Sequence, residues 1–224
     1  MDQAKLAAAI TNVNEAEQSG RLSPEASSNI RRWLSSDSFA SYQAELCRSI
    51  GAGEWKSLED LFYKVLEFGT GGRRGLMAPI GTNVLNERTM AESARGLVNV
   101  LLAKEAVSGR KMSVVIAHDT RHNSPEFARV CARAIAAAGL DVWLFDSFRS
   151  TPLLSFAVRH LKCDAGIMIT ASHNPPSDNG FKCYNNLGGQ VVPPDDSAII
   201  DAVVALADKP IPLADFDAAV AAGQ

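Results

Sequence analysis

The chain lacks three features that would each point to a class of protein. It has no apolar run near the roughly 20 residues needed to cross a bilayer, so we expect no membrane span. Its formal net charge is −3, which argues against a nucleic-acid binder that depends on bulk positive charge. Its first residues, MDQAKLAAAI, lack the charged start and long apolar core of a signal peptide, so they predict an amphipathic helix.

Cysteine is also scarce. The four cysteines, Cys47, Cys131, Cys163 and Cys183, are scattered without a C-x-x-C pair. This spacing favours neither zinc nor disulfides and suggests a reducing, cytoplasmic setting, with Cys131 and Cys163 buried as small hydrophobes. What the chain does have is 224 residues, 46% of them hydrophobic, enough for one soluble domain plus an appendage.

Residues 1–66 show helical patterns only, and we interpret them as a small helical N-terminal extension. Ser23-Pro24-Glu25 predicts a helix start, with Ser23 as N-cap and Pro24 at the first helical position. A further helix is expected over residues 38–50, ending at Gly51. Ser57-Leu58-Glu59-Asp60 resembles a capping box and predicts another helix start.

Residues 67–208 alternate strands with helices. Strands are predicted at 113–117, 141–146 and 165–169, and helices at 86–109, 124–139, 151–161 and from Asp195 to about residue 206. This alternation predicts an α/β domain of three layers, with a mainly parallel sheet covered on both faces. Residues 179–192 predict a hairpin or meander that adds an antiparallel edge, making the sheet mixed. Residues 209–224 are interpreted as a linker towards downstream domains.

Three polar loops follow the three predicted strands: HDTRHNS, DSFRSTP and TASHNPP. Because ligands bind outside the carboxyl ends of parallel strands, all three loops should open on one edge of the sheet. In the third loop, spacing alone leaves open whether Ser172 is a turn residue or a reactive hydroxyl. An acyl-enzyme serine would need a G-x-S-x-G elbow, which is absent. A phosphoryl acceptor would need nearby cations and N–H donors, which could come from His173, Asn174, Lys182, Arg74 and Arg121.

The stretch FGTGGRRG (68–75) also has two interpretations. Its glycines could let the backbone approach an anion, and its arginines favour phosphate, but a flexible hinge explains the glycines equally well. It is neither a P-loop nor a dinucleotide fingerprint. Arg121 could likewise be a surface partner of Asp119 or a second anion contact. His118 and His122 lie in a loop and are interpreted as loop polar residues rather than metal ligands.

Together these motifs resemble a known family. From Phe68 to about Val192 the chain is similar to the N-terminal catalytic domain of the α-D-phosphohexomutases, the phosphoglucomutase/phosphomannomutase superfamily. The similarity is carried by FGTGGRRG, DTRHNS and, most specifically, GIMITASHNPPSDNGFK. The helical extension and PLLSFAVRHLKCDAGIMITASHNP resemble most the branch of phosphoglucomutase 2 and phosphopentomutase type enzymes.

The resemblance implies a role for each matching residue. Ser172 would carry the phosphoryl group, His173 and Asn174 would flank it, and Lys182 would be a general acid or base. Arg74 would contact phosphate or support the acid–base step, and Arg121 would shape the same pocket. The other residues expected to contact phosphate or substrate are Gly71, Gly72 and Thr170.

The resemblance also implies cofactors and partners. The complete enzyme would interconvert sugar 1- and 6-phosphates through a bisphosphosugar, with Mg²⁺ on the phosphate of Ser172 and a sugar 1,6-bisphosphate as activator. The family's aspartate-rich metal loop D-G-D-x-D-R and its sugar and distal-phosphate loops are absent from these residues. We therefore expect this part alone to be inactive and to work with downstream domains. The alternatives are a non-catalytic anion-binding module and a serine hydrolase.

Overall fold

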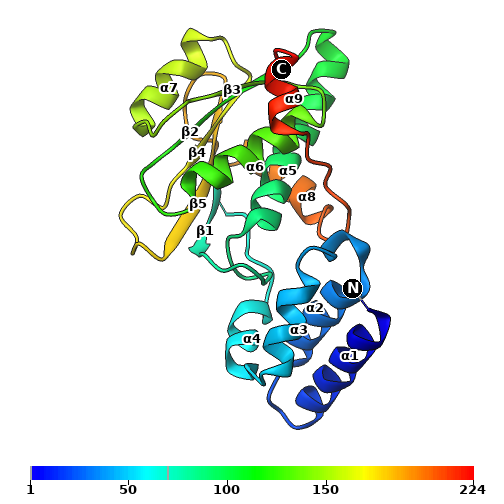
Figure 1. Ribbon diagram of the computed structural model, residues 1–224. Helices are drawn as coiled ribbons and strands as arrows, with labels where there is room; N and C mark the ends of the chain where they lie inside the picture. Colours follow the sequence, from blue (N-terminus) through cyan, green and yellow to red (C-terminus); the bar gives the residue numbers. More distant parts are fainter. Residues whose placement is uncertain (1, 70) are drawn as a thin grey trace. The chain divides into compact units, whose positions relative to one another are not determined.

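The computed structural model describes residues 2–69 and 71–224, which form two compact units (Figure 1). The first unit contains the residues up to Glu67, together with Met77–Asn86 and Asp208–Pro210. The second contains Phe68–Leu76, Glu87–Ala207 and Ile211–Gln224. Among the described residues, no helix has the length and apolar character needed to cross a membrane.

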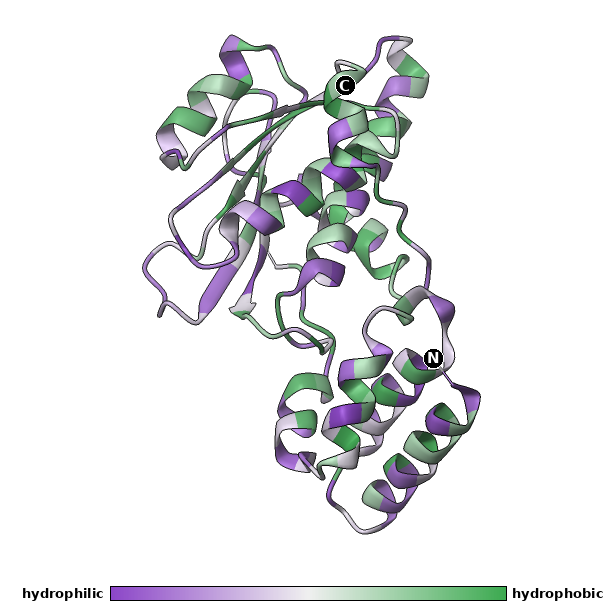
Figure 2. Cartoon of the chain, in the orientation of Figure 1, coloured by the Kyte–Doolittle hydropathy of each residue, from purple (hydrophilic) through white to green (hydrophobic). Residues whose placement is uncertain are grey.

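The first unit is helical, as predicted. Its elements are α1 (Gln3–Gln18), α2 (Pro24–Ser35), the 3₁₀ turn η1 (Asp37–Phe39), α3 (Gln43–Gly51) and α4 (Trp55–Phe62). Hydrophobic and hydrophilic residues alternate along these helices (Figure 2), and the hydrophobic ones enclose a core around Trp33, which stacks on Phe39 with ring centroids 4.7 Å apart. Ser23 caps α2 as predicted, because its hydroxyl accepts a hydrogen bond from the Ala26 amide at 3.1 Å.

Two helices in this unit are present as predicted but begin at other residues. The capping box at Ser57 does not form, because α4 begins at Trp55 and the Glu59 carboxylate instead accepts from the Ser23 amide at 2.8 Å. The single helix expected over residues 38–50 is divided into η1 and α3. The break places Phe39 in the core against Trp33, a tertiary contact that local sequence pattern does not encode.

The second unit is an α/β domain with a five-stranded mixed sheet in the order β1-β5-β4-β2-β3. The pairs β4/β2 and β2/β3 are parallel, and β1/β5 and β5/β4 are antiparallel. Its strands are β1 (Gly72–Leu76), β2 (Ser113–His118), β3 (Asp141–Leu144), β4 (Ala165–Ile169) and β5 (Asp178–Asn185). Its helices are α5 (Glu87–Ser108), α6 (Ser124–Ala136), α7 (Thr151–His160), α8 (Asp195–Val204) and α9 (Phe216–Ala221).

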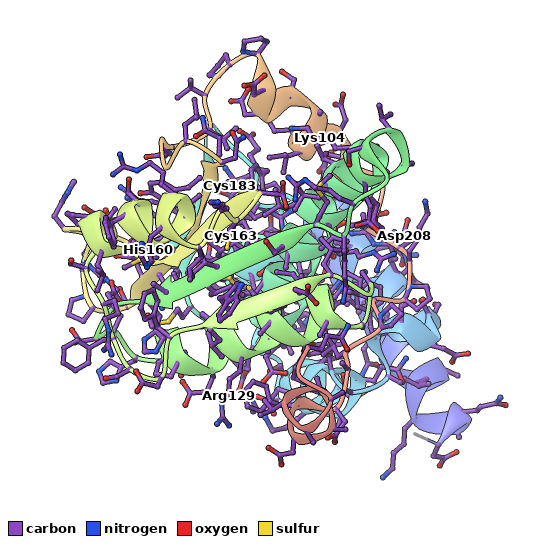
Figure 3. All side chains as sticks on the ribbon, turned by 90° about the horizontal axis from the view of Figure 1, so that it is seen from above. Lys104, Arg129, His160, Cys163, Cys183 and Asp208 are labelled. Carbon is purple, nitrogen blue, oxygen red and sulfur yellow. The ribbon has the colours of Figure 1, made fainter. Side chains whose placement is uncertain are left out.

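Helices cover both faces of the sheet, which confirms the predicted three layers (Figure 1). Helix α7 packs on β2 and β4, where Leu154 and Val158 meet Val115 and Met168. Helix α6 packs on the opposite face, and α5 lies against α6 with α8 behind it. Viewed from above, His160 of α7 and Arg129 of α6 lie on opposite sides of the strands (Figure 3). Cys131 and Cys163 are buried, as predicted.

The antiparallel addition differs from the prediction in position. Strand β5 is not an edge strand, because β1 pairs with its outer side from Gly72 to Leu76. The prediction of a glycine-rich loop or hinge over residues 68–75 is wrong for residues 72–75, which belong to β1. Thr70 of the same stretch lies outside the described residues.

The terminal segment, expected to be a linker, contains α9. The Asp215 carboxylate caps this helix by accepting from the Ala218 amide at 2.9 Å. Helix α9 packs on α6, with the Arg129 guanidinium 4.6 Å from the centre of the Phe216 ring. Part of this segment is therefore an ordered element of the α/β unit.

Candidate functional site

The three predicted loops do meet at one edge of the sheet. Strands β4, β2 and β3 run parallel, so the loops after Ile169, His118 and Leu144 leave from the same side. Backbone hydrogen bonds join them: the Asp119 amide donates to the Ile169 carbonyl at 3.1 Å, and the Arg149 amide donates to the His118 carbonyl at 2.9 Å. A cavity of about 530 Å³ opens between these loops.

We call this space the edge cavity. Residues from all three loops line it: Asp119, Thr120, Arg121, His122, Arg149, Ser150, Thr151, Met168, Thr170, Ser172, Asn174 and Pro176. Four of the predicted site residues are in this set, namely Arg121, Thr170, Ser172 and Asn174. The structure does not place His173, Lys182, Arg74, Gly71 or Gly72 in the cavity wall.

Ser172 has an unusual backbone conformation, with a φ of 59° in the left-handed region. Two hydrogen bonds hold the turn: the Ser172 amide donates to Thr170 Oγ1 at 2.9 Å, and the Asn174 amide donates to the Ala171 carbonyl at 3.2 Å. Thr170 is buried while Ser172 is exposed. The turn therefore presents the Ser172 hydroxyl to solvent at the cavity, at a conformational cost that is typical of functional sites.

Arg121 holds the serine loop in shape. Its Nη1 donates to the carbonyls of Pro175 and Asp178 at 2.7 and 3.1 Å. Its Nη2 donates to the carbonyls of Ser172 and Asn174 at 2.8 and 2.7 Å. Its Nε lies 3.3 Å from a carboxylate oxygen of Asp119. A guanidinium has five N–H donors, so this side chain meets five protein oxygens and supports the loop rather than facing an anion.

Asp119 anchors the loop that carries Arg121. One of its carboxylate oxygens accepts from the Arg121 amide at 3.0 Å and from the Ser124 hydroxyl at 2.8 Å. The same hydroxyl accepts from the buried Asn179 amide group at 2.9 Å. The segment HDTRHNS is thus fixed to β5 through Asn179. The surface-pair interpretation of Arg121 and Asp119 is incomplete, because both groups belong to this wider network.

Asn174 joins the serine loop to β1. Its side-chain carbonyl accepts from Arg74 Nη1 at 3.2 Å, and its amide donates to the Asp178 carboxylate at 2.9 Å. Arg74 is otherwise exposed. This contact brings Arg74 from β1 to the loop that carries Ser172, although the two are about a hundred residues apart in sequence.

Strand alternation gives the two adjacent arginines of β1 different roles. Arg73 pairs in register with Phe181, and Arg74 with Gly180, so their side chains lie on opposite faces of the sheet. Arg73 is buried against α5, where it donates to the Thr89 carbonyl at 3.1 Å and to Glu92 at 3.2 Å. Arg74 lies on the face shared by Lys182 and Met168.

Lys182 has the electrostatic surroundings expected of a proton carrier. Partial burial lowers the pKa of its ammonium group below the usual 10.5, and the nearby Arg74 charge lowers it further, while Asp119 acts in the opposite direction. A lysine with a lowered pKa loses its proton at a lower pH than a fully solvated lysine does. Its position on β5 opposite Met168, which lines the edge cavity, places it on the same face of the sheet.

The glycines that were expected to approach a ligand pack instead against protein backbone. A Cβ at Gly72 would overlap the Phe181 carbonyl oxygen, and one at Gly180 would overlap that of Thr170. The Gly71 carbonyl accepts from the Cys183 amide at 2.8 Å. Close approach of β1, β5 and the serine loop explains Gly72 and Gly180, and the phosphate contacts of Gly71 and Gly72 stay predictions.

The histidines form neither a triad nor a metal centre. Ser172 Oγ lies 3.5 Å from His173 Nδ1, which is long for the bond that activates a serine nucleophile. His118 Nδ1 lies 2.8 Å from its neighbouring Asp119 carbonyl, and His122 offers its carbonyl to Asn179. Residues 2–69 and 71–224 contain no group of three His, Cys, Asp or Glu side chains placed to hold a metal ion.

The sequence pattern did not single out Arg149, Ser150 and Thr151 as site residues. It placed their loop, DSFRSTP, at the correct edge but gave it no role. The structure puts all three residues in the wall of the edge cavity with Ser172. The available signal was a basic residue between a strand end and a helix start, which is a common and therefore weak pattern.

The fold and the edge cavity define an α/β/α domain with an exposed serine loop at the carboxyl ends of its parallel strands. Residues 65–209 match the family model described as phosphoglucomutase/phosphomannomutase, alpha/beta/alpha domain I. The chain belongs to the phosphoglucomutase/phosphomannomutase family.

Individual relatives agree with this assignment. A phosphoglucomutase of Staphylococcus epidermidis is 47% identical over 59% of the chain, and the human phosphopentomutase is 36% identical over 77%. A candidate phosphomannomutase from Thermus thermophilus, whose structure is solved, is 38% identical and superposes with a TM-score of 0.56 over 62% of the chain. The chain spans 23%, 29% and 30% of these three proteins, respectively. The predicted resemblance to the superfamily and to its phosphopentomutase branch is confirmed.

Proposed function

We propose that this chain is the phosphoryl-carrying domain of a phosphosugar mutase, with Ser172 as the carrier. The observation that supports this most is the serine loop itself. Four carbonyls bound to Arg121 fix its shape, and the left-handed turn at Ser172 presents a hydroxyl at the cavity. A turn that served only as a connection would need neither feature.

The proposed reaction has two phosphoryl transfers. At the start, Ser172 carries the phosphoryl group. A hydroxyl of a sugar monophosphate attacks the phosphorus of this group, the bond from that phosphorus to Ser172 Oγ breaks, and a bisphosphosugar forms. After the bisphosphosugar reorients, Ser172 Oγ attacks the phosphorus of its other phosphate, the bond from that phosphorus to the sugar oxygen breaks, and the isomeric monophosphate leaves. Each attacking hydroxyl loses a proton and each leaving oxygen gains one. We assign these proton transfers to Lys182, because its lowered pKa favours general acid–base catalysis. Arg74 lies nearby and would balance the negative charge of the phosphate.

Among the described residues, no group of three His, Cys, Asp or Glu side chains is placed to hold a metal ion. Asp119, a carboxylate in the wall of the edge cavity, already accepts from the Arg121 amide and the Ser124 hydroxyl. A Mg²⁺ ion prefers octahedral oxygen ligands, of which these residues would supply the phosphate on Ser172. The Mg²⁺ and the sugar 1,6-bisphosphate activator stay proposals. On this basis we also propose that the chain alone does not turn over substrate and needs further domains.

Phosphoryl uptake tests the assignment. The chain and a Ser172→Ala control would be incubated with glucose 1,6-bisphosphate and Mg²⁺, and their intact masses compared. We expect the wild-type chain to gain one phosphate and the control to gain none. No gain by the chain, nor by a longer protein that contains it, would exclude Ser172 as the carrier and favour a non-catalytic anion-binding module. Labelling of Ser172 by a fluorophosphonate would instead favour a hydrolase.

A further inference from the structure

The edge cavity contains a second basic side chain whose role is still open. Two arginines line the cavity, Arg121 and Arg149. All four Nη hydrogens of Arg121 point at loop carbonyls, and its Nε faces Asp119. Arg121 therefore has no donor left for a ligand unless the loop opens. A contact between an anion and an arginine of the cavity wall therefore has to come from Arg149.

Arg149 does have donors left. Its Nη1 donates to the Phe148 carbonyl at 2.8 Å, and its Nη2 donates to the Asp146 carboxylate at 2.8 Å. Within the part of the chain that the structure describes, these are its two hydrogen bonds, so three of five N–H groups remain. The ion pair with Asp146 is weak competition, because the Asp146 side chain is 86% exposed.

The backbone of Arg149 is better fixed than its side chain. Its amide donates to the His118 carbonyl at 2.9 Å, which ties this loop to the end of β2. The guanidinium also lies 5.4 Å from the centre of the Phe145 ring, a contact that limits its range of movement. Arg149 is thus a partly pre-positioned cation in the wall of the edge cavity.

Two hydroxyls stand beside it. Ser150 is the N-cap of α7, but among the described residues its side chain makes no capping hydrogen bond, unlike that of Ser23 at α2. Thr151 is the first residue of α7, and both residues line the edge cavity with Ser172. A guanidinium and two hydroxyls on three consecutive residues of one cavity wall are a donor set suited to the oxygens of a phosphate ester.

We propose that Arg149, Ser150 and Thr151 form a phosphate subsite in the edge cavity, which holds the phosphate ester that exchanges its phosphoryl group with Ser172. This inference rests on the proposed function for its ligand, but its geometry does not depend on it. The subsite would orient the sugar phosphate from the side of α7, whereas Arg74 and Lys182 act from the side of β1 and β5.

Titration with α-D-glucose 1-phosphate tests the subsite. The ¹⁵N-labelled chain would be followed by NMR, with the amides of residues 149–151 and of the serine loop as reporters. We expect Arg149→Gln to raise the dissociation constant about ten-fold or more, because a charge-assisted phosphate contact is lost. The dissociation constant of Arg149→Lys should lie between those of the wild type and of Arg149→Gln. Lysine keeps the positive charge but loses the two parallel N–H donors of the guanidinium.

Two further variants control the test. Arg159, at the other end of α7, is exposed and contacts the Ser155 carbonyl, so Arg159→Gln removes the same charge outside the cavity and should leave the affinity unchanged. Asp146→Asn removes the carboxylate that competes for Arg149, so it should lower the dissociation constant of α-D-glucose 1-phosphate. Wild-type affinity in Arg149→Gln, or an equal loss in Arg159→Gln, would overturn the subsite.

The outcomes separate this inference from the proposed function. Phosphoryl uptake at Ser172 together with unchanged affinity in Arg149→Gln would reject the subsite and leave the function standing. Binding that depends on Arg149 without any phosphoryl uptake at Ser172 would support the subsite and reject the proposed function. Circular dichroism of each variant would show whether the fold is intact, and Asp146→Asn gives an independent reading should Arg149→Gln fold poorly.

Discussion

Removing the charge of Glu92 should destabilise the α/β unit strongly. One carboxylate oxygen of Glu92 accepts from Arg88 Nε at 2.8 Å, and the other from Arg73 Nη1 at 3.2 Å. The three side chains are 9% exposed or less. Burial lowers the pKa of Arg73, and its Nε has no hydrogen-bond partner among the described residues. The Glu92 carboxylate is therefore the main group that offsets the cost of burying the positive charge of Arg73.

The magnitude follows from what Glu92→Gln leaves behind. The variant keeps the shape of the side chain but removes the negative charge that pairs with the two buried guanidinium groups of Arg73 and Arg88. Breaking a buried ion pair in this way costs about 3–5 kcal/mol. Since a domain of this size is stable by roughly 5–15 kcal/mol, the loss would be a large part of the total. Replacing Arg73, Arg88 and Glu92 together by methionine should cost less, because no unpaired charge remains.

The assay is urea denaturation followed through amide signals of β2 and β4, which report on the α/β unit alone. Asp141→Asn is the matched control, because Asp141 pairs with Lys111 at 2.5 Å and both side chains are about half exposed. Its cost should stay under about 1 kcal/mol. If Glu92→Gln cost no more than this control, the argument that the buried triad stabilises β1 against α5 would be refuted.

Three further predictions concern the serine loop and its neighbours. Arg74→Gln should raise the pKa of Lys182 towards 10.5, because it removes a neighbouring positive charge, and ¹³C NMR would measure this pKa. In the wild type, unfolded Lys182 binds its proton more tightly than folded Lys182 does. The free energy of unfolding should therefore rise with pH between the lowered pKa and about 10.5. Arg121→Gln should speed hydrogen exchange at the Asn174 amide, because four carbonyls lose their donor, and unchanged exchange would contradict the supporting role. Ser172→Gly should be about 1 kcal/mol more stable than Ser172→Ala in urea denaturation, since glycine tolerates the left-handed φ; equal stabilities would mean that the turn is unstrained.

The alternating strands and helices of this fold can be predicted from the sequence. Short apolar runs separated by helices with Ser-Pro or Thr-Pro starts predict β2, β3, β4, α6 and α7, and they also place three loops at one edge. These elements form because local pattern and tertiary environment agree. Ser172 could be singled out in the same way, from its position after a buried strand.

Strand β1 could not be predicted in this way, although the antiparallel addition that contains β5 was. Strand β1 is G-R-R-G-L, with two glycines and two charges, and no strand propensity scale favours it. It forms because Gly72 and Gly180 let three backbone segments approach closely and because Glu92 neutralises a buried arginine. Both causes join residues that are distant in sequence, so they are visible only after folding.

The arginines show why residue type alone is a poor guide to an anion site. Sequence analysis singled out Arg74 and Arg121 for phosphate because both occur in motifs. In the structure the donors of Arg121 are used by loop carbonyls, while Arg149, a cavity-wall residue outside those motifs, has three N–H groups without a hydrogen bond among the described residues. What distinguishes a structural from a ligand-binding guanidinium is how many donors the protein has already used. That number depends on tertiary carbonyl positions, and for this reason we assign the phosphate contact of the edge cavity to Arg149 and its shape to Arg121.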